Sequence, residues 1–187
     1  MIEKIMKEQT CSTKSSRLIL IGYRCCGKTT IAPLIAQKLG FTFWDADRYL
    51  EQKWGRTIQD IFQNEGESQF RQWESEVIQE LCQKQEIVLA TGGGVIIREE
   101  NRRFLKNAGF VVWLQAEAVT LWNRMQNDPQ TMTQRPNLAQ GGLAEIEQIL
   151  TKRTLWYQET CHLAISAELD WPEILADRIV KAWSQYI

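Results

Sequence analysis

The stretch RLILIGYRCCGKTT, residues 17–30, joins an apolar run to a glycine-bounded loop that ends in lysine and threonine. The loop matches the pattern G-x-x-x-x-G-K-[ST] through Gly22, Gly27, Lys28 and Thr29. In such a loop backbone N–H groups turn toward phosphate oxygens, the lysine reaches the outer phosphates and the hydroxyl can ligate Mg²⁺. A strand precedes the loop and a helix follows it, which is the context that this motif requires. The sequence therefore predicts a nucleotide-binding loop.

Short strand-like runs alternate with helical patterns after this loop. The expected strands span residues 17–22, 41–45, 86–91, 110–114 and 162–166, and the expected helices span residues 29–39, 58–84, 99–107, 118–126, 145–159 and 172–186. Strands that alternate with helices pair in parallel, and near-continuous apolar strands suit a sheet covered on both faces. We therefore expect an α/β fold with three layers, doubly wound around a five-stranded parallel sheet.

Two segments interrupt this alternation. Residues 44–84 form a long helical insertion between the second and third strands, and residues 127–142 contain prolines and glycines with little periodicity. A connector of that kind is typical of a functional, mobile lid. The length of 187 residues favours one domain. We expect that domain over residues 17–187, after a polar tail over residues 1–16.

Composition excludes several classes of protein. The net charge of −1 gives no overall attraction to nucleic acid or to an anionic membrane, and we expect neither as a partner. The longest apolar runs are far shorter than the roughly 20 residues that span a bilayer. Five cysteines and one histidine, without regular spacing, indicate neither a disulfide framework nor a zinc site. A reducing cytosol is the expected compartment.

The two cysteines of the loop allow two interpretations. Cys25 stands where many such loops carry glycine, and Cys26 follows it. They are either small side chains tolerated beside phosphate, which we favour, or oxidation-sensitive thiols, because a helix N-terminus lowers the pKa of a thiol.

Two aspartates, Asp45 and Asp47, follow the second expected strand. The carboxyl ends of parallel strands face the ligand crevice of such folds. One carboxylate there can hold Mg²⁺ through water while the other accepts a hydrogen bond from a substrate hydroxyl. The alternative is a turn in which an aspartate caps the following helix.

Arg71 lies four residues after Glu67 and three before Glu74, so on a helix both carboxylates would hold its guanidinium. That arrangement is either a surface salt-bridge ladder of little energetic value or an oriented guanidinium that grips a substrate carboxylate with two parallel bonds.

Glycines and arginines complete the candidate site. Residues 92–94, three glycines after the third strand, are either a flexible turn or a cradle where a ligand approaches bare backbone. Arg135 in the expected lid is a candidate for neutralising charge during phosphoryl transfer. Arg153 in the next helix and Arg124 before the lid either serve the site or face solvent.

Together these motifs resemble those of the shikimate kinase family. The matching motifs are the loop at residues 22–29, Asp45-Ala46-Asp47, Gly66-Glu67-x-x-Phe70-Arg71, Gly92–Gly94, Arg135-Pro136 and Arg153-x-x-x-Tyr157. They occur in order over residues 17–183. The resemblance implies a P-loop kinase fold and ATP-dependent phosphorylation of the 3-hydroxyl of shikimate, in the biosynthesis of chorismate and aromatic amino acids. It also implies Mg²⁺, a substrate-binding role for the insertion, and a cytoplasmic monomer.

The resemblance further implies roles for individual residues. Catalysis would fall to Lys28, Asp47 and Arg135. Shikimate would be bound by Asp47, Arg71, Gly93, Arg153, Phe62 and Phe70. ATP would be bound by Gly22, Arg24, Cys25, Cys26, Gly27, Lys28, Thr29, Thr30, Arg124 and Arg135. Mg²⁺ would be bound by Thr29 and, through water, by Asp45.

Two other functions compete with this one. A kinase of another small metabolite, such as gluconate, would keep the loop but would need no pair of arginines for a carboxylate. A non-catalytic nucleotide-binding module would be expected to lose Lys28, Asp47 or Arg135, and the sequence retains all three.

Overall fold

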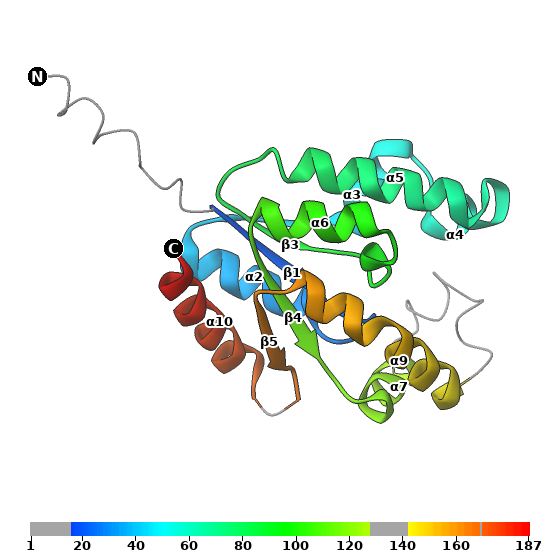
Figure 1. Cartoon of the computed structure of the whole chain (residues 1–187). Helices are drawn as coiled ribbons and strands as arrows, with labels where there is room; N and C mark the ends of the chain where they lie inside the picture. Colours follow the sequence, from blue (N-terminus) through cyan, green and yellow to red (C-terminus); the bar gives the residue numbers. More distant parts are fainter. Residues whose placement is uncertain (1–15, 128–141, 169) are drawn as a thin grey trace, which may run out of the picture.

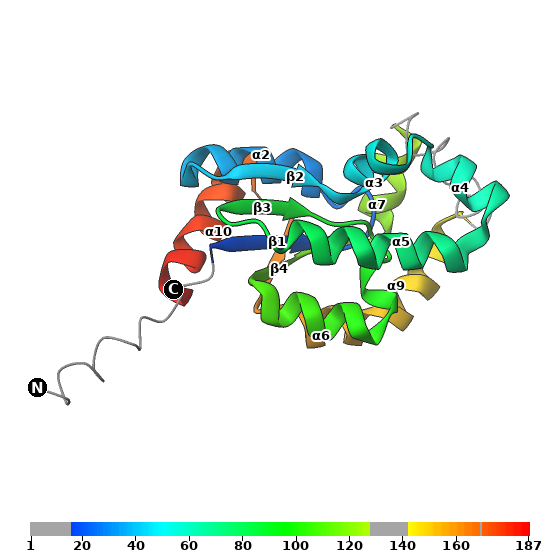
Figure 2. The same ribbon diagram turned by 90° about the horizontal axis from the view of Figure 1, so that it is seen from above.

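The computed structural model describes residues 16–127, 142–168 and 170–187. Five parallel strands form one sheet in the order β2-β3-β1-β4-β5. Their bounds are β1 Arg17–Ile21, β2 Thr42–Asp45, β3 Ile87–Ala90, β4 Phe110–Gln115 and β5 Leu163–Ser166. Each lies within two residues of its predicted position. The parallel α/β sheet is therefore confirmed, and Figure 2 shows β2, β3, β1 and β4 side by side.

Helices cover both faces of the sheet, because the strands bury side chains on both. Leu18 and Leu20 of β1 pack in a core with α2 (Lys28–Leu39), α7 (Ala118–Gln126) and α10 (Pro172–Tyr186). Ile19 and Ile21 face the opposite core, with α5 (Gly66–Leu81) and α6 (Glu99–Ala108). In Figure 1, α5 and α6 lie on one side of the strands and α2 and α10 on the other. These are the three layers that the alternating sequence predicts.

The prediction of one continuous helix over residues 58–84 is wrong. The chain forms α4 (Ile58–Asn64) and α5 in its place, with Glu65 between them. Gly66 has φ of 81°, a left-handed conformation that interrupts a right-handed helix and that glycine adopts without strain. Before them lies α3 (Ala46–Trp54), which ends at Gly55 with φ of 64°. The insertion is therefore three helices.

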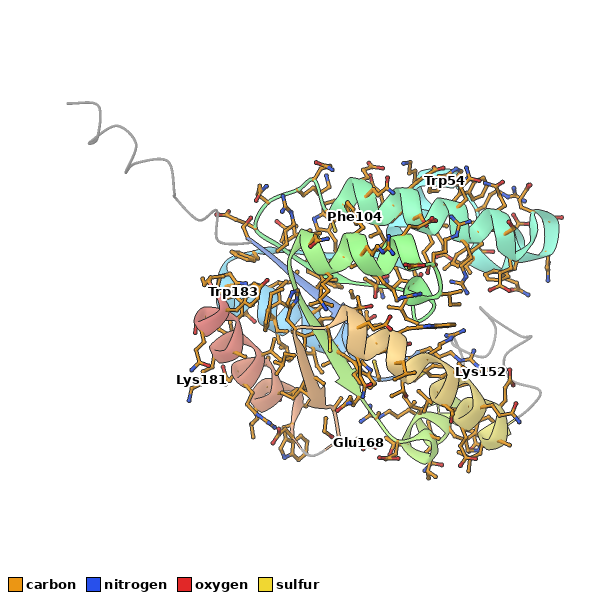
Figure 3. The ribbon with its side chains drawn as sticks, viewed as in Figure 1. Trp54, Phe104, Lys152, Glu168, Lys181 and Trp183 are labelled. Carbon is orange, nitrogen blue, oxygen red and sulfur yellow. The ribbon has the colours of Figure 1, made fainter. Side chains whose placement is uncertain are left out.

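The insertion lies beyond the carboxyl ends of the strands (Figure 2), and aromatic packing holds its helices together. Trp54 of α3 stacks on Trp73 of α5, with ring centroids 4.8 Å apart and planes at 17°. Figure 3 places Trp54 on the insertion and Trp183 on α10, at opposite ends of the molecule.

The remaining elements agree with the sequence apart from one short helix. Where a helix was predicted over residues 145–159, α9 runs over Gly142–Thr160 without a break. A 3₁₀ helix, η1 (Val95–Ile97), follows the three glycines and was not predicted. The N-terminal tail to residue 15 and most of the expected lid, Arg135 included, lie outside the described residues. Among the described helices, none is both long and apolar enough to cross a bilayer.

The strand register sets the position of the candidate site. Ala90 of β3 is paired with Leu20 of β1 and with Asp45 of β2. Three adjacent strands therefore end at the same level, where β1 leads into the glycine-bounded loop, β2 into Asp45 and β3 into the three glycines.

Candidate active site

The glycine-bounded loop folds around its own lysine. Lys28 Nζ donates hydrogen bonds to the carbonyls of Gly22 at 2.9 Å and Tyr23 at 2.8 Å, and only 7% of the residue is exposed. Gly22 has φ of 144°, and a Cβ there would lie 2.6 Å from the carbonyl oxygen of Leu114. Gly27, with φ of 103°, precedes α2, whose N-terminus has no side-chain cap within the described structure. The first N–H groups of α2 and the Lys28 ammonium thus converge on the loop that the motif predicts.

The two loop cysteines have different environments. Cys25 has φ of 61°, a conformation in which glycine has no steric strain, and its side chain is half-buried. Cys26 is buried, and its Sγ accepts a hydrogen bond from Lys28 Nζ at 3.5 Å. The interpretation of both cysteines as small side chains tolerated beside phosphate stays a prediction.

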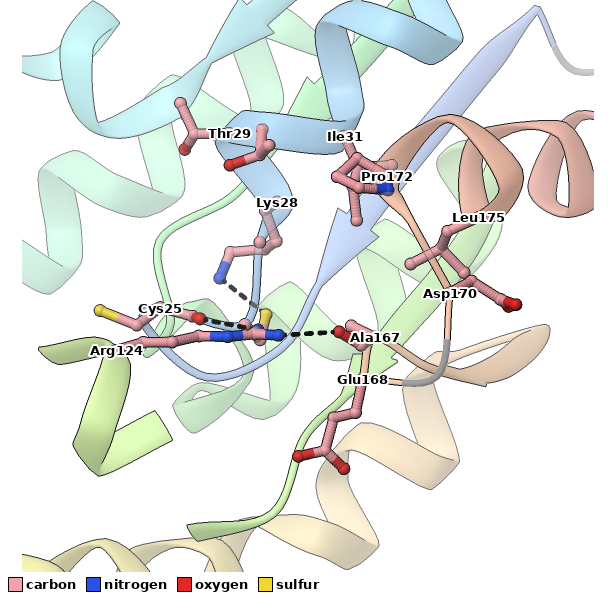
Figure 4. A pocket seen from close by; sticks show the side chains of 13 residues that line it. Cys25, Lys28, Thr29, Ile31, Arg124, Ala167, Glu168, Asp170, Pro172 and Leu175 are labelled. Carbon is pink, nitrogen blue, oxygen red and sulfur yellow. Dashed lines mark hydrogen bonds between the residues drawn. The ribbon is translucent and has the colours of Figure 1, made fainter. Parts of the chain in front are cut away.

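A cavity of about 530 Å³ lies beside this loop (Figure 4). The lining residues are Cys25, Cys26, Gly27, Lys28, Thr29, Thr30, Ile31, Arg124, Ala167, Glu168, Asp170, Pro172 and Leu175. Arg124 spans the cavity wall, because its guanidinium donates to the carbonyls of Cys25 at 3.3 Å and Ala167 at 2.9 Å. The sequence predicted the loop and Arg124 here. It missed the segment after β5, whose one signal was its position at the carboxyl end of a parallel strand.

Asp45 accepts two hydrogen bonds, one from the helix that follows it and one from the phosphate loop. Its Oδ1 accepts a hydrogen bond from the Arg48 N–H at 3.1 Å and so caps α3, as the alternative interpretation held. Its Oδ2 accepts from Thr29 Oγ1 at 3.0 Å. A carboxylate and a hydroxyl beside a phosphate loop are the hard oxygen donors that suit Mg²⁺. The described residues contain no group of three or more acidic, histidine or cysteine side chains that could hold a metal alone.

Arg71 is buried between its two carboxylates. It bonds Glu74 at 2.8 Å and Glu67 at 3.0 Å and 3.2 Å, and the exposed fractions are 8% for Arg71 and 2% for Glu74. Burial alone would lower the pKa of Arg71. The charge of Glu74 and the hydrogen bonds to Glu74 and Glu67 outweigh it, so the pKa is raised. The surface-ladder interpretation is therefore wrong. The substrate-binding role stays a prediction.

Because the three glycines have no side chains, charged side chains pack directly against their backbone. A Cβ on Gly92 would lie 2.7 Å from both Asp47 Oδ1 and Glu74 Oε1, and a Cβ on Gly94 would lie 2.7 Å from the Arg71 guanidinium carbon. These side chains come from α3 and α5. The glycine segment is therefore a surface against which both Asp47 and Arg71 pack, at Gly92 and Gly94 respectively.

Gly93 links the glycine segment to both the phosphate loop and α9. A Cβ on Gly93 would lie 3.0 Å from the backbone nitrogen of Arg24 in the loop. On its other side, the Gly93 carbonyl accepts from Arg153 Nη1 at 3.3 Å and from the Tyr157 hydroxyl at 2.8 Å. Arg153 is therefore not simply a solvated residue, and it shares the segment with Arg71. Tyr157 belongs to the matching motif Arg153-x-x-x-Tyr157 but was assigned no role at the site, although its spacing of four from Arg153 places both on one helix face.

Phe62 and Phe70 also meet, with ring centroids 4.6 Å apart. Phe70 is fully buried, and the Arg71 guanidinium lies 5.1 Å from the centre of its ring. The Phe62 and Phe70 pair therefore lies beside the Arg71 guanidinium, and the contact of these rings with a substrate stays a prediction.

A family model described as shikimate kinase matches residues 24–184. The chain belongs to the shikimate kinase family. A shikimate kinase of Rhodopirellula baltica is 38% identical to it, over 90% of this chain and 91% of the relative. Among solved structures, shikimate kinase from Acinetobacter baumannii in complex with shikimate has a TM-score of 0.85 and 34% identity, covering 91% of this chain and 93% of that one.

A more distantly related solved structure is that of a kinase named for gluconate, the alternative substrate. A gluconokinase from Sinorhizobium meliloti has a TM-score of 0.53 at 13% identity, covering 92% of this shikimate kinase family member and 93% of the gluconokinase. At that identity the likeness shows the fold alone. The P-loop kinase fold is thus shared, and the family match separates this chain from the gluconate alternative.

Proposed function

We propose that this chain transfers the γ-phosphoryl group of ATP to the 3-hydroxyl of shikimate, giving shikimate 3-phosphate and ADP in aromatic amino-acid biosynthesis. The observation that carries the proposal is that Asp47 and Arg71 both pack against the glycine segment, whose Gly93 packs against the phosphate loop. A carboxylate that can bind hydroxyls and a guanidinium that can bind a carboxylate would then lie beside the phosphate donor.

ATP would bind through residues 22–30 with its base toward Arg124. Lys28 would exchange its bonds with the Gly22 and Tyr23 carbonyls for bonds with the outer phosphates. Thr29 would hold Mg²⁺ directly and Asp45 through water. Held by these residues, Mg²⁺ would supply positive charge that stabilises the negative charge developing during phosphoryl transfer.

Shikimate would bind between the insertion and the glycine segment. Arg71 and Arg153 would bind its carboxylate, and Asp47 would orient or deprotonate the attacking hydroxyl. The Gly93 backbone N–H would bind substrate, and Phe62 and Phe70 would contact the ring. Since phosphoryl transfer depends chiefly on positioning and electrostatic stabilisation, this chain needs no further reactive group.

The remaining roles rest on the sequence motifs. Arg135, outside the described residues, would approach the transferred phosphate from a lid over residues 127–142. We also propose one domain, a substrate-binding insertion over residues 44–84, and a cytoplasmic monomer without nucleic-acid or membrane partners.

ADP release from ATP and Mg²⁺ tests the proposal, with shikimate, gluconate or quinate added separately. Stimulation by shikimate alone is the expected result. Stimulation by gluconate or quinate instead would reject the substrate. No stimulation by any of the three, in a protein that binds ATP, would favour the non-catalytic nucleotide-binding module.

A further inference from the structure

We propose that Tyr157 is a positioning residue whose hydroxyl holds the Gly93 carbonyl and thereby orients the Arg153 guanidinium for a substrate carboxylate. This inference rests on the proposed function and adds a residue to the carboxylate side of the site.

The Tyr157 hydroxyl is an obligate donor in a dry environment. The residue is 0% exposed, and its hydroxyl lies 2.8 Å from the Gly93 oxygen. Burial raises the pKa of Tyr157, so the proton stays on the hydroxyl. A buried hydroxyl without an acceptor is costly, so this bond strongly favours one arrangement of carbonyl and ring.

The sheet fixes where the Tyr157 ring lies. Its ring stacks on Trp113 of β4, with centroids 5.3 Å apart and planes at 13°. Trp113 is 7% exposed and is paired in the sheet with Ile21, the residue before Gly22 of the phosphate loop. The Tyr157 ring therefore packs against the sheet, and the phosphate loop follows β1 of the same sheet.

Arg153 and Tyr157 donate to the same carbonyl oxygen, that of Gly93, but at different distances. A carbonyl oxygen has two lone pairs and can accept both donors. The Tyr157 bond is short at 2.8 Å, whereas the bond from Arg153 Nη1 is long at 3.3 Å. The tyrosine therefore sets the position of the carbonyl. The arginine takes its orientation from that carbonyl through Nη1 and from the neighbouring Tyr157 hydroxyl, with which it also interacts. Its planar fork carries five N–H donors, so donors remain for a carboxylate.

Gly93 has little freedom to move away from these donors. On the side of the phosphate loop, a Cβ at Gly93 would lie 3.0 Å from Arg24 N and 3.4 Å from the Tyr23 carbonyl carbon. The backbone of Gly93 is therefore held between the loop and α9. Without the Tyr157 hydroxyl, the Gly93 backbone would lose a hydrogen bond from α9 and keep its contacts with the phosphate loop.

Tyr157→Phe removes the hydroxyl and keeps the stacked ring. Tyr186→Phe is the control, because it deletes a hydroxyl that lies 3.4 Å from His162 Nε2 at the C-terminal end of α10 and outside the candidate site. We expect Tyr157→Phe to raise the dissociation constant of shikimate about 3- to 10-fold, the range for one lost hydrogen bond. The affinity for ATP and the kcat should change less than twofold, and Tyr186→Phe should leave all three unchanged.

Two further measurements separate positioning from general loosening of the core. The methyl ester of shikimate lacks the carboxylate charge, so Tyr157→Phe should weaken shikimate but not the ester. This ratio is measured within one protein, so it tolerates partial loss of folded material. In a double-mutant cycle with Arg153→Gln, the effect of Tyr157→Phe should largely disappear, because the hydroxyl acts through the arginine.

An unchanged shikimate-to-ester ratio, or additive effects in the cycle, would overturn the positioning role. If the unmutated protein bound ATP but neither shikimate nor its ester, the proposed function itself would fail. Binding of shikimate by the unmutated protein with an unmoved ratio in Tyr157→Phe would reject the inference alone.

Discussion

Gly92→Ala tests the glycine segment as the meeting point of the substrate-binding groups. The new Cβ would lie 2.7 Å from Asp47 Oδ1 and from Glu74 Oε1, where ordinary contact begins at 3.4 Å. The oxygens must therefore retreat by 3.4 − 2.7 = 0.7 Å if the backbone stays in place. Glu74 is 2% exposed and bonded to Arg71, so the less buried Asp47 carboxylate should move further.

A displacement of about 1 Å at a catalytic group can lower a rate about 10²-fold. We therefore expect Gly92→Ala to lower kcat by roughly 10- to 100-fold while the ATP affinity stays near its original value. Steady-state ADP release gives kcat, and nucleotide titration gives the affinity.

Gly40→Ala is the matched control for that substitution. Gly40 ends α2 with φ of 69°, and a Cβ there would meet nothing within 4 Å. It should cost about 1 kcal/mol of stability through backbone strain and leave kcat unchanged. A Gly92→Ala protein with the original kcat and shikimate KM would refute the idea that close approach at Gly92 positions Asp47.

Three other predictions follow from single residues. Arg71→Lys keeps the charge but loses the donor fork, so the shikimate KM should rise roughly 10- to 100-fold; an unchanged KM would remove Arg71 from carboxylate binding. Cys25→Gly relieves a left-handed conformation and should gain roughly 1 kcal/mol of stability, about 2–4 °C in Tm; a lower Tm would show that the side chain contributes more than the strain costs. Burial, with a smaller contribution from Lys106, lowers the pKa of His162, and its Nδ1 accepts the Val111 N–H at 3.0 Å, so the fold favours the neutral ring. The stability that the neutral His162 ring contributes is therefore present above pH 6.5 and lost as the pH falls below it. Between pH 7 and pH 5, the melting temperature of His162→Asn should fall less than that of the original chain. Equal decreases in melting temperature would contradict this.

The sequence was sufficient for the fold because local signals there agree with the tertiary structure. Each expected strand is an apolar run between turn residues or helical patterns, and each was found within two residues. The helix break at Gly66 was missed because an amphipathic pattern continues across it and only the left-handed φ reveals the break.

The site was less predictable because its contacts join distant segments. The sequence indicated that Arg71 lies between two carboxylates, since helix spacing alone brings them together. It did not indicate that Gly92 faces Asp47 and Glu74, because that contact depends on how α3 and α5 pack against the end of β3. The acceptor of the Tyr157 hydroxyl depends equally on the packing of α9.

The most direct measurement of the central claim compares shikimate-dependent ADP release by the original chain and by Asp47→Ala, with ATP affinity measured in parallel. We predict that shikimate stimulates ADP release by the original chain, and that Asp47→Ala loses this stimulation but still binds ATP. An Asp47→Ala protein that binds ATP and responds fully to shikimate would contradict the assignment of Asp47 to the reacting hydroxyl.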